Sequence, residues 1–348
     1  NENFSVVGIY GFRPESTIIM KRLGQLSEIS EIEAKVAVEN TVAGISTAYY
    51  RLILELQRYQ VLKETLRLSK ARVDIAQAQY ELGGAGKRDF LSAQVDYNGD
   101  SSLLLTQEEI ILNARVNLNE LMAVAPELEY TINDSIIISE PLQLELLLEN
   151  AFLENKQLLI TQRQKNVAFL QIRELQASRL PAINLNGSYL NNTLNSDAGF
   201  LIQNQRQGFN YGGNITVNLF NGLTLNRRIQ NAKVQQKIQE YSLDQFEIQL
   251  QSDIQRAFNT YQKNRQLLVI EQENYQVAKE NSEIALERFR LGIASYLEFR
   301  DAQVNLLTAE NRLITSIFQI KVQEIELLRL SGKIFFENNS ESFIPSSN

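Results

Sequence analysis

The stretch Leu82-Gly-Gly-Ala-Gly-Lys-Arg-Asp-Phe-Leu-Ser-Ala-Gln-Val95 returns 209 positions later as Leu291-Gly-Ile-Ala-Ser-Tyr-Leu-Glu-Phe-Arg-Asp-Ala-Gln-Val304. The Leu-Gly pair, an Ala, a Phe and the closing Ala-Gln-Val are identical, and residues 48–122 align with 257–331 without a gap. A period this long indicates a duplicated half-protein and not a short solenoid repeat. The sequence therefore predicts two equivalent halves, whose pseudo-symmetry suggests a ring or a tube.

Each half contains one very long helix. Apolar periodicity predicts helices over 18–82, 88–122, 142–180, 224–291 and 297–331. The first of these would extend over roughly 95 Å, which is far longer than a globular core needs. Glycine-containing tips at 83–87 and 292–296 allow sharp turns between antiparallel helices. We expect a first repeat over 1–180, with a connector at 123–141 that holds possible short strands at 130–132 and 136–138. A second repeat covers 181–332, closed by a Gly332 cap, and a polar tail covers 333–348.

Two apolar seams run along each long helix. In the first half they are Leu52, Tyr59, Leu66, Val73 and Tyr80, and Val61, Leu68, Ile75 and Leu82. The two series are offset by nine residues, or two and a half helical turns. They therefore lie on opposite sides of the helix. The second half repeats them as Tyr261, Leu268, Tyr275 and Phe289, and Ile270, Val277, Ile284 and Leu291. A helix with opposite seams has a neighbour on each side, which favours a closed cylinder of helices. A helix buried in a large bundle is the alternative.

Three segments have the pattern of strands. Residues 3–12 are a possible strand, and 183–193 and 209–219 alternate apolar with polar side chains around a polar loop that ends near 208. Segments of about ten residues with one apolar and one polar face are typical of a membrane β-barrel with a wet lumen. A half-buried hairpin of a soluble sandwich would show the same alternation.

The composition argues against most catalytic chemistry. The 348 residues include no His and no Cys, which removes the usual zinc and copper ligands and the Cys and His nucleophiles. We therefore expect no enzyme, no catalytic residues, no metal and no cofactor. The net charge of −7 argues against nucleic acid as the main partner. No run of 18 apolar residues predicts a transmembrane helix.

The repeated arrangement of strand, long helix, glycine tip and helix resembles the TolC-type outer membrane efflux protein family. The Phe289-Arg-Leu-Gly292 tip and the Asn218-Leu-Phe-Asn-Gly222 strand end support the resemblance. It implies a mainly α fold with membrane β-strands, in which a homotrimer forms one α-helical barrel in the periplasm and one shared transmembrane β-barrel in outer membrane lipid. It also implies an exit duct of a tripartite efflux or type I secretion system, served by a periplasmic adaptor and an inner-membrane pump. Twelve strands need four per subunit, so we expect the first strand to lie before residue 1.

The resemblance also assigns roles to the tips. It places adaptor contacts on the two turns, at Leu82, Gly83, Gly84, Ala85, Leu291, Gly292, Ile293 and Ala294. It places a periplasmic gate at Asp89, Glu298 and Asp301, where three-fold symmetry would form rings of acids that attract cations. Relatives have a basic residue where this chain has Ala294, so a lock would use other residues, with Lys87, Arg88 and Arg300 as candidates. Tight turns and a solvated acidic helix face are the alternatives.

Two other classes of protein have long helical hairpins. A periplasmic adaptor has one hairpin flanked by compact β domains, whereas this sequence predicts two hairpins. A coiled-coil stalk needs a single seam and no duplication of 209 residues. Trimers in detergent would support the duct over both.

Overall fold

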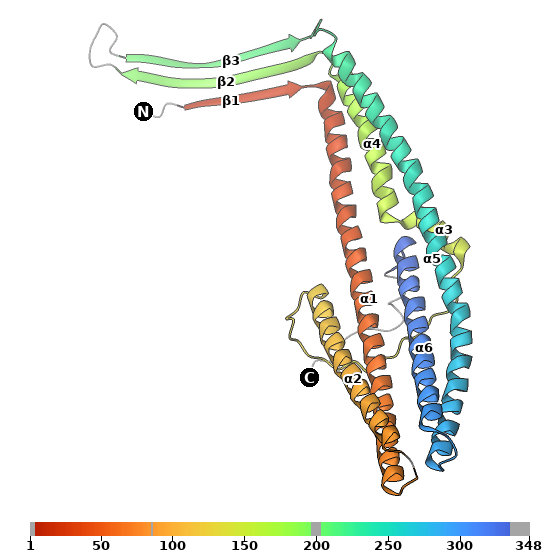
Figure 1. The fold of residues 1–348 in the computed structure, drawn as a ribbon. Helices are drawn as coiled ribbons and strands as arrows, with labels where there is room; N and C mark the ends of the chain where they lie inside the picture. Colours follow the sequence, from red (N-terminus) through yellow and green to blue (C-terminus); the bar gives the residue numbers. More distant parts are fainter. Residues whose placement is uncertain (1–3, 85, 196–202, 335–348) are drawn as a thin grey trace. The chain divides into compact units, whose positions relative to one another are not determined.

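A computed structural model describes residues 4–84, 86–195 and 203–334 (Figure 1). The element order is β1 (Phe4–Phe12), α1 (Pro14–Glu81), α2 (Lys87–Leu121), α3 (Leu144–Glu154), α4 (Lys156–Ala177), β2 (Ala182–Asn195), β3 (Gln203–Thr216), α5 (Thr224–Arg290) and α6 (Tyr296–Leu330). The chain forms two compact units: unit 1 comprises 1–35 and 156–248, and unit 2 comprises 36–155 and 249–348. Each unit takes segments from both predicted repeats, so the repeat boundaries at 180 and 332 stay predictions.

Unit 1 contains a three-stranded antiparallel sheet in the order β1-β2-β3. Phe12 pairs with Ile183, which pairs with Ile215, so the strand ends that join helices lie at one end of the sheet. Tyr189 and Phe209 are cross-strand partners with ring centroids 4.7 Å apart, on the apolar face. The pleat places the paired Asn184 and Asn214 on the opposite face.

The structure corrects the bounds of the third strand. We predicted it at 209–219 after a polar loop, but β3 begins at Gln203 and ends at Thr216. Gln205 and Gln207 pair with Thr193 and Asn191 of β2. Backbone hydrogen bonds extend the ladder irrespective of side-chain polarity, which explains why a polar segment continues the strand. The residues of the predicted loop at 196–202 lie outside the described residues.

The helices of unit 1 are joined by ion pairs of α4. Arg22 of α1 donates from Nε to Glu174 Oε2 at 2.7 Å, and Lys165 lies 3.8 Å from Glu240 of α5. Since α4 contacts helices from both sides, it links the segments of α1 and α5 that adjoin the sheet.

The predicted helix over 142–180 is two helices, which is a second correction. Asn155 ends α3 with an extended backbone, at ψ 115°, and its side-chain amide donates to the Leu330 carbonyl at 2.9 Å. Gly332, with φ +73°, lies against the backbone of Glu154. A Cβ added at Gly332 would be 2.8 Å from the Glu154 carbonyl oxygen. Periodicity is a local signal, and it did not register this contact between residues far apart in the chain.

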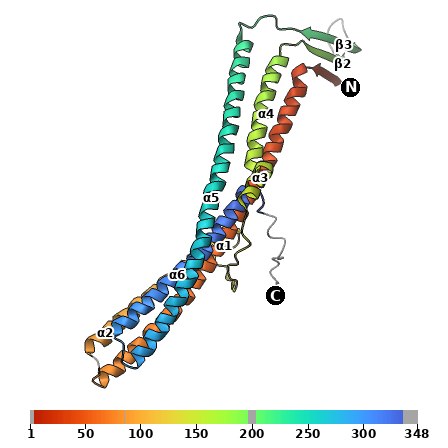
Figure 2. The same cartoon turned by 90° about the vertical axis from the view of Figure 1, so that its right-hand side faces the viewer.

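Unit 2 joins α1, α2, α5 and α6 in a chain of contacts. Gln107 of α2 donates to the Glu55 carbonyl of α1 at 3.0 Å, Arg58 of α1 donates to Thr315 of α6 at 3.1 Å, and Arg312 of α6 pairs with Glu271 of α5 at 3.1 Å. Figure 1 shows the same order, with α2 and α5 outermost in this unit. The turned view of Figure 2 shows both helical turns at the same end of unit 2.

The connector between α2 and α3 contains no strand among the described residues, so the possible strands at 130–132 and 136–138 were wrong. The connector is held by other means. The Asn119 amide donates to the carbonyls of Pro126 and Leu128, both at 3.0 Å, and Ile136 is buried against Ile53. In the described part of the chain, no helix combines the length and the apolar character needed to cross a bilayer.

Candidate functional site at the helical tips

The two turns between long helices have the same backbone geometry. Gly83 has φ +75°, its N–H donates to the Tyr80 carbonyl at 3.0 Å, and the next N–H donates to the Gln79 carbonyl at 2.8 Å. Gly292 has φ +70°, and the equivalent bonds reach Phe289 at 3.0 Å and Arg288 at 2.9 Å. Both are Schellman caps, which favour glycine at the left-handed position. Residues that are 209 positions apart therefore make equivalent backbone hydrogen bonds, in addition to being similar in sequence.

The side chains below the turns keep the same relation. Tyr80 stacks on Phe90 with centroids 6.4 Å apart, and Phe289 stacks on Phe299 at 5.6 Å. Phe289 and Phe299 belong to a buried cluster with Val73, Ala76, Ala93, Ala294 and Tyr296. This cluster draws side chains from α1, α2, α5 and α6, and it fixes the position of both turns within unit 2.

The predicted adaptor-contact residues mostly lie on the surface. Leu82 is 87% exposed, Leu291 73% and Ile293 66%, and the three tip glycines are also exposed. Ala85 lies outside the described residues. Ala294 is buried in the tip cluster, so we remove it from the predicted contact surface. Four large apolar side chains, including Leu297, therefore face solvent around the turns.

The predicted gate acids are exposed, and one of them has a structural role that we did not predict. Glu298 completes a capping box: its carboxylate accepts from the Ser295 N–H at 2.9 Å, while its own N–H donates to Ser295 Oγ at 3.2 Å. Asp89 occupies the equivalent position of α2, where Gly86 offers no side-chain cap. Asp301 lies on the same helix as Glu298, beyond the first turn. Nothing in this geometry tests the gate assignment, which stays a prediction.

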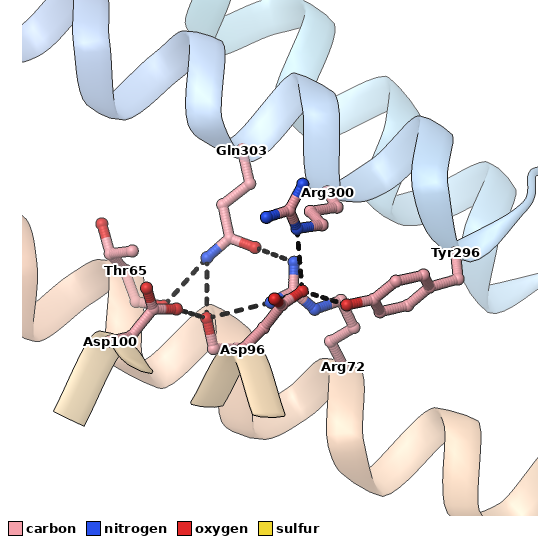
Figure 3. Close-up of polar contacts among 8 residues, drawn as sticks. Thr65, Arg72, Asp96, Asp100, Tyr296, Arg300 and Gln303 are labelled. Carbon is pink, nitrogen blue, oxygen red and sulfur yellow. Dashed lines mark hydrogen bonds and ion pairs between the residues drawn. The ribbon is translucent and has the colours of Figure 1, made fainter. Parts of the chain in front are cut away.

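A polar network joins three helices next to the tip cluster (Figure 3). Asp96 of α2 accepts from the Tyr296 hydroxyl and from Arg300 Nε at 2.9 Å, both on α6. The same carboxylate lies 3.4 Å from Arg72 Nη2 of α1, whose side chain is only 2% exposed. Arg72 also stacks over the Tyr296 ring at 5.3 Å. The candidate Arg300 is thus placed in an ion pair, whereas Lys87 and Arg88 are exposed.

A glutamine completes the network. Gln303 accepts from Arg72 Nη1 at 2.8 Å and donates to the Thr65 carbonyl at 3.0 Å and to Ser69 Oγ at 3.1 Å. Ser69 in turn donates to Asp100 of α2. Burial, reinforced by the hydrogen bond to Asp96, raises the pKa of Tyr296 above its ordinary value of 10, so the phenol stays protonated near neutrality. These hydrogen bonds and ion pairs run between α1, α2 and α6, so the network fastens α2 and α6 to α1.

Our reasoning from the sequence missed Asp96, Arg72 and Gln303. A signal was present: Arg72 lies four residues after Leu68 and three before Ile75, on the side of a predicted seam, where a charge needs a partner. The residues 209 positions away from Arg72 and Asp96 are both asparagines, so the network marks places where the two halves differ.

With this geometry established, comparison with known proteins gives a consistent result. Residues 147–333 match the family model described as outer membrane efflux protein. The chain is 22% identical over 314 residues to the probable efflux pump outer membrane protein TtgC of Pseudomonas putida, covering 86% of this chain and 62% of TtgC. It is equally similar to the antibiotic efflux pump outer membrane protein ArpC of the same species. The chain thus spans somewhat under two thirds of the length of these relatives.

Solved structures show the same fold. The outer membrane protein VceC of Vibrio cholerae superposes with a TM-score of 0.79 at 17% identity, over 95% of this chain and 79% of VceC. The open state of the MtrE outer membrane channel of Neisseria gonorrhoeae superposes with a TM-score of 0.78 at 15% identity, over 96% and 81%. At these identities the likeness establishes the fold alone.

Proposed function

Because the chain belongs to the outer membrane efflux protein family, we propose that three copies of it enclose a passive exit duct that crosses the outer membrane and extends into the periplasm. Strands β1–β3 supply part of a shared membrane barrel, with the apolar face toward lipid and the asparagine face toward the lumen. The long helices form the wall of the periplasmic part. The chain acts as a conduit and not as an enzyme.

The observation that carries this proposal is an apolar stripe on each outermost helix of unit 2. On α5, Ile270, Val277 and Ile284 follow a seven-residue spacing and are 53%, 63% and 52% exposed. These are residues of the second predicted seam, and the equivalent residues 209 positions earlier on α1 are more buried: Val61 is 7% exposed. The first seam of α5, which includes Tyr261 and Phe289, is therefore buried within the chain. The second seam of α5 is exposed to solvent.

On α2, a second apolar stripe faces solvent. Its members share one side of the helix: Leu91, Val95, Leu105, Leu112 and Val116, between 45% and 69% exposed. Burying such a side chain stabilises an assembly by about 1 kcal/mol or more. Two different apolar edges on opposite sides of unit 2 favour a head-to-tail contact, and a head-to-tail contact that closes produces a ring.

The tips supply the periplasmic end of the duct in this proposal. The exposed Leu82, Leu291 and Ile293 form an apolar surface suited to helical hairpins of a periplasmic adaptor, which would link the duct to an inner-membrane pump. Glu298 and Asp301, repeated three times, would form the acidic rings of the gate, with Asp89 near them. The Asp96 network supplies the restraint that keeps the tips closed, since it fastens α2 to α6 within each copy.

Cysteine cross-linking tests the ring. The chain has no cysteine, so Val95→Cys combined with Ile284→Cys places one thiol on each apolar edge at a similar distance from the tips. We expect oxidation to produce covalent dimers and then trimers, with no larger species.

The two single-cysteine variants are the matched controls. In a head-to-tail ring Val95 meets α5 of the next copy, so neither single variant should cross-link. Cross-linked dimers from a single variant would indicate a two-fold contact instead, and a ladder beyond trimers would indicate an open filament. Either result would rule out the duct.

A further inference from the structure

At each of the three junctions between strands and helices, arginine lies within about one helical turn of an exposed apolar side chain. Phe12, 64% exposed, precedes Arg13 between β1 and α1, and Arg179 precedes Leu180, 56% exposed, between α4 and β2. After β3, Leu223 is 60% exposed, and one turn later α5 presents Arg227 and Arg228. The sheet register places all three connections at the same end of β1–β3.

This basic character contrasts with the chain as a whole, whose net charge is −7. From Leu175 to Gln239 the sequence has one acid, Asp197, against six basic residues: Arg179, Arg206, Arg227, Arg228, Lys233 and Lys237. Within the described residues, Arg13, Arg179, Arg227 and Arg228 have no acidic side chain as an ion-pair partner. Only Arg179 has a side-chain hydrogen bond there, to Asn226 at 2.6 Å.

Four exposed arginines without acidic partners at one end of the sheet form a basic surface that attracts anions. A guanidinium group can donate two parallel hydrogen bonds to two oxygens of one phosphate. It is also less strongly hydrated than an ammonium group, which suits a partly desolvated surface. An apolar side chain next to each arginine adds the second component of an interfacial anchor, since the apolar part enters the acyl region while the charge stays at the headgroups.

We propose that Arg13, Arg179, Arg227 and Arg228 form a belt that binds the phosphate groups of anionic phospholipids at the helix-side surface of the membrane. The proposal rests on the proposed function, because it needs β1–β3 to lie in the bilayer. The belt fixes the depth at which the sheet ends and the helices begin. Phe12, Leu180 and Leu223 reach the acyl chains, and the arginines hold the headgroups.

Lipid selectivity of the purified, full-length protein tests the belt. The protein is reconstituted in phosphatidylcholine vesicles with spin-labelled phosphatidylglycerol or spin-labelled phosphatidylcholine, and electron spin resonance measures the protein-bound fraction of each. We expect the wild type to prefer phosphatidylglycerol about three-fold, and the preference to weaken in high salt. Replacing the four arginines by glutamine should lower the ratio to about one.

Two further variants make the test decisive. Replacing all four arginines by lysine retains the charge and should retain most of the preference, so a loss there would count against a belt based on phosphate contacts. Replacing Lys63, Arg67, Lys70 and Lys279 of unit 2 by glutamine removes the same charge elsewhere and should leave the ratio unchanged. An unchanged ratio in the four-glutamine variant of the belt would overturn the proposal.

The same experiment separates this proposal from the duct itself. Vesicle-inserted trimers without any headgroup preference would refute only the belt. A wild-type protein that does not insert into vesicles would refute the proposed function and the belt together.

Discussion

Replacing Asp96 by asparagine should release the tips while leaving the trimer assembled. The substitution keeps the shape of the side chain and removes its charge. Asp96 is the acidic group that faces Arg72 at 3.4 Å and Arg300 at 2.9 Å, and it accepts the Tyr296 hydroxyl. With asparagine, Arg72 keeps its bond to Gln303 but loses the only anion within ion-pair distance of it in the described residues.

The magnitude follows from the burial of the two guanidinium groups. Arg300 is 43% exposed, so its pair with Asp96 contributes less than about 1 kcal/mol. Arg72 is 2% exposed, and leaving a buried charged group without its ion-pair partner costs about 1–3 kcal/mol or more. We therefore expect about 2–3 kcal/mol to be lost from the closed state. If the contacts exist only in that state, the open-to-closed ratio rises about 30- to 160-fold per copy.

Conductance in planar bilayers measures that ratio. Asp96→Asn should raise the fraction of time that single trimers spend open. Asp74→Asn is the matched control, because its pair with Lys70 is exposed on both sides and contributes little. The reasoning is refuted if Asp96→Asn lowers the unfolding midpoint but leaves the open fraction at the wild-type value. The network would then serve only the stability of unit 2.

Three other predictions follow from the tip geometry. Glu298→Gln with Asp301→Asn should lower cation preference, seen as a shift in reversal potential under a salt gradient, while glutamine preserves the capping box; unchanged selectivity would remove these residues from the gate. Gly292→Ala should cost about 1 kcal/mol in urea unfolding because φ is +70°, whereas Gly84→Ala should cost less, and equal costs would contradict the role of the left-handed turn. The raised pKa of Tyr296 means that the folded state favours the neutral phenol. The stability that this group contributes is therefore constant below pH 10 and is lost as the pH rises above 10. Tyr296→Phe should reduce the fall in melting temperature at alkaline pH.

The sequence predicted the ends of long helices well where the residues that end the helix are adjacent to it in the chain. The helix predicted over 88–122 runs over Lys87–Leu121, and that predicted over 224–291 runs over Thr224–Arg290. Glycine-rich turns set three of these four ends, and a left-handed cap is specified by the residues that form it. The Gly332 cap is confirmed in the same way: its φ is +73° and the next N–H bonds the Leu328 carbonyl.

Elements that depend on partners distant in the sequence were not predictable in this way. The break at Asn155 requires the Leu330 carbonyl, and the early start of β3 requires β2 beside it. The network around Asp96 brings together residues about 200 positions apart. Periodicity identifies which side of a helix is buried, but it does not identify which polar side chains will meet there.

The repeat itself explains why the network occurs once and not twice. The 209-residue offset maps Arg72, Asp96 and Arg300 onto Asn281, Asn305 and Leu91. In a closed ring of three copies, the interface equivalent to α1–α2–α6 would lie between α5 and α6 of one copy and α2 of the next. Within a copy, the contacts at this level include the ion pairs and hydrogen bonds of Asp96, whereas the proposed contacts between copies would be apolar. In the proposed duct, a restraint that depends on charges could be broken locally at the tips, while the apolar edges would keep the copies together. In the proposed ring, the two halves would thus separate two tasks, assembly and closure, at positions where their sequences differ.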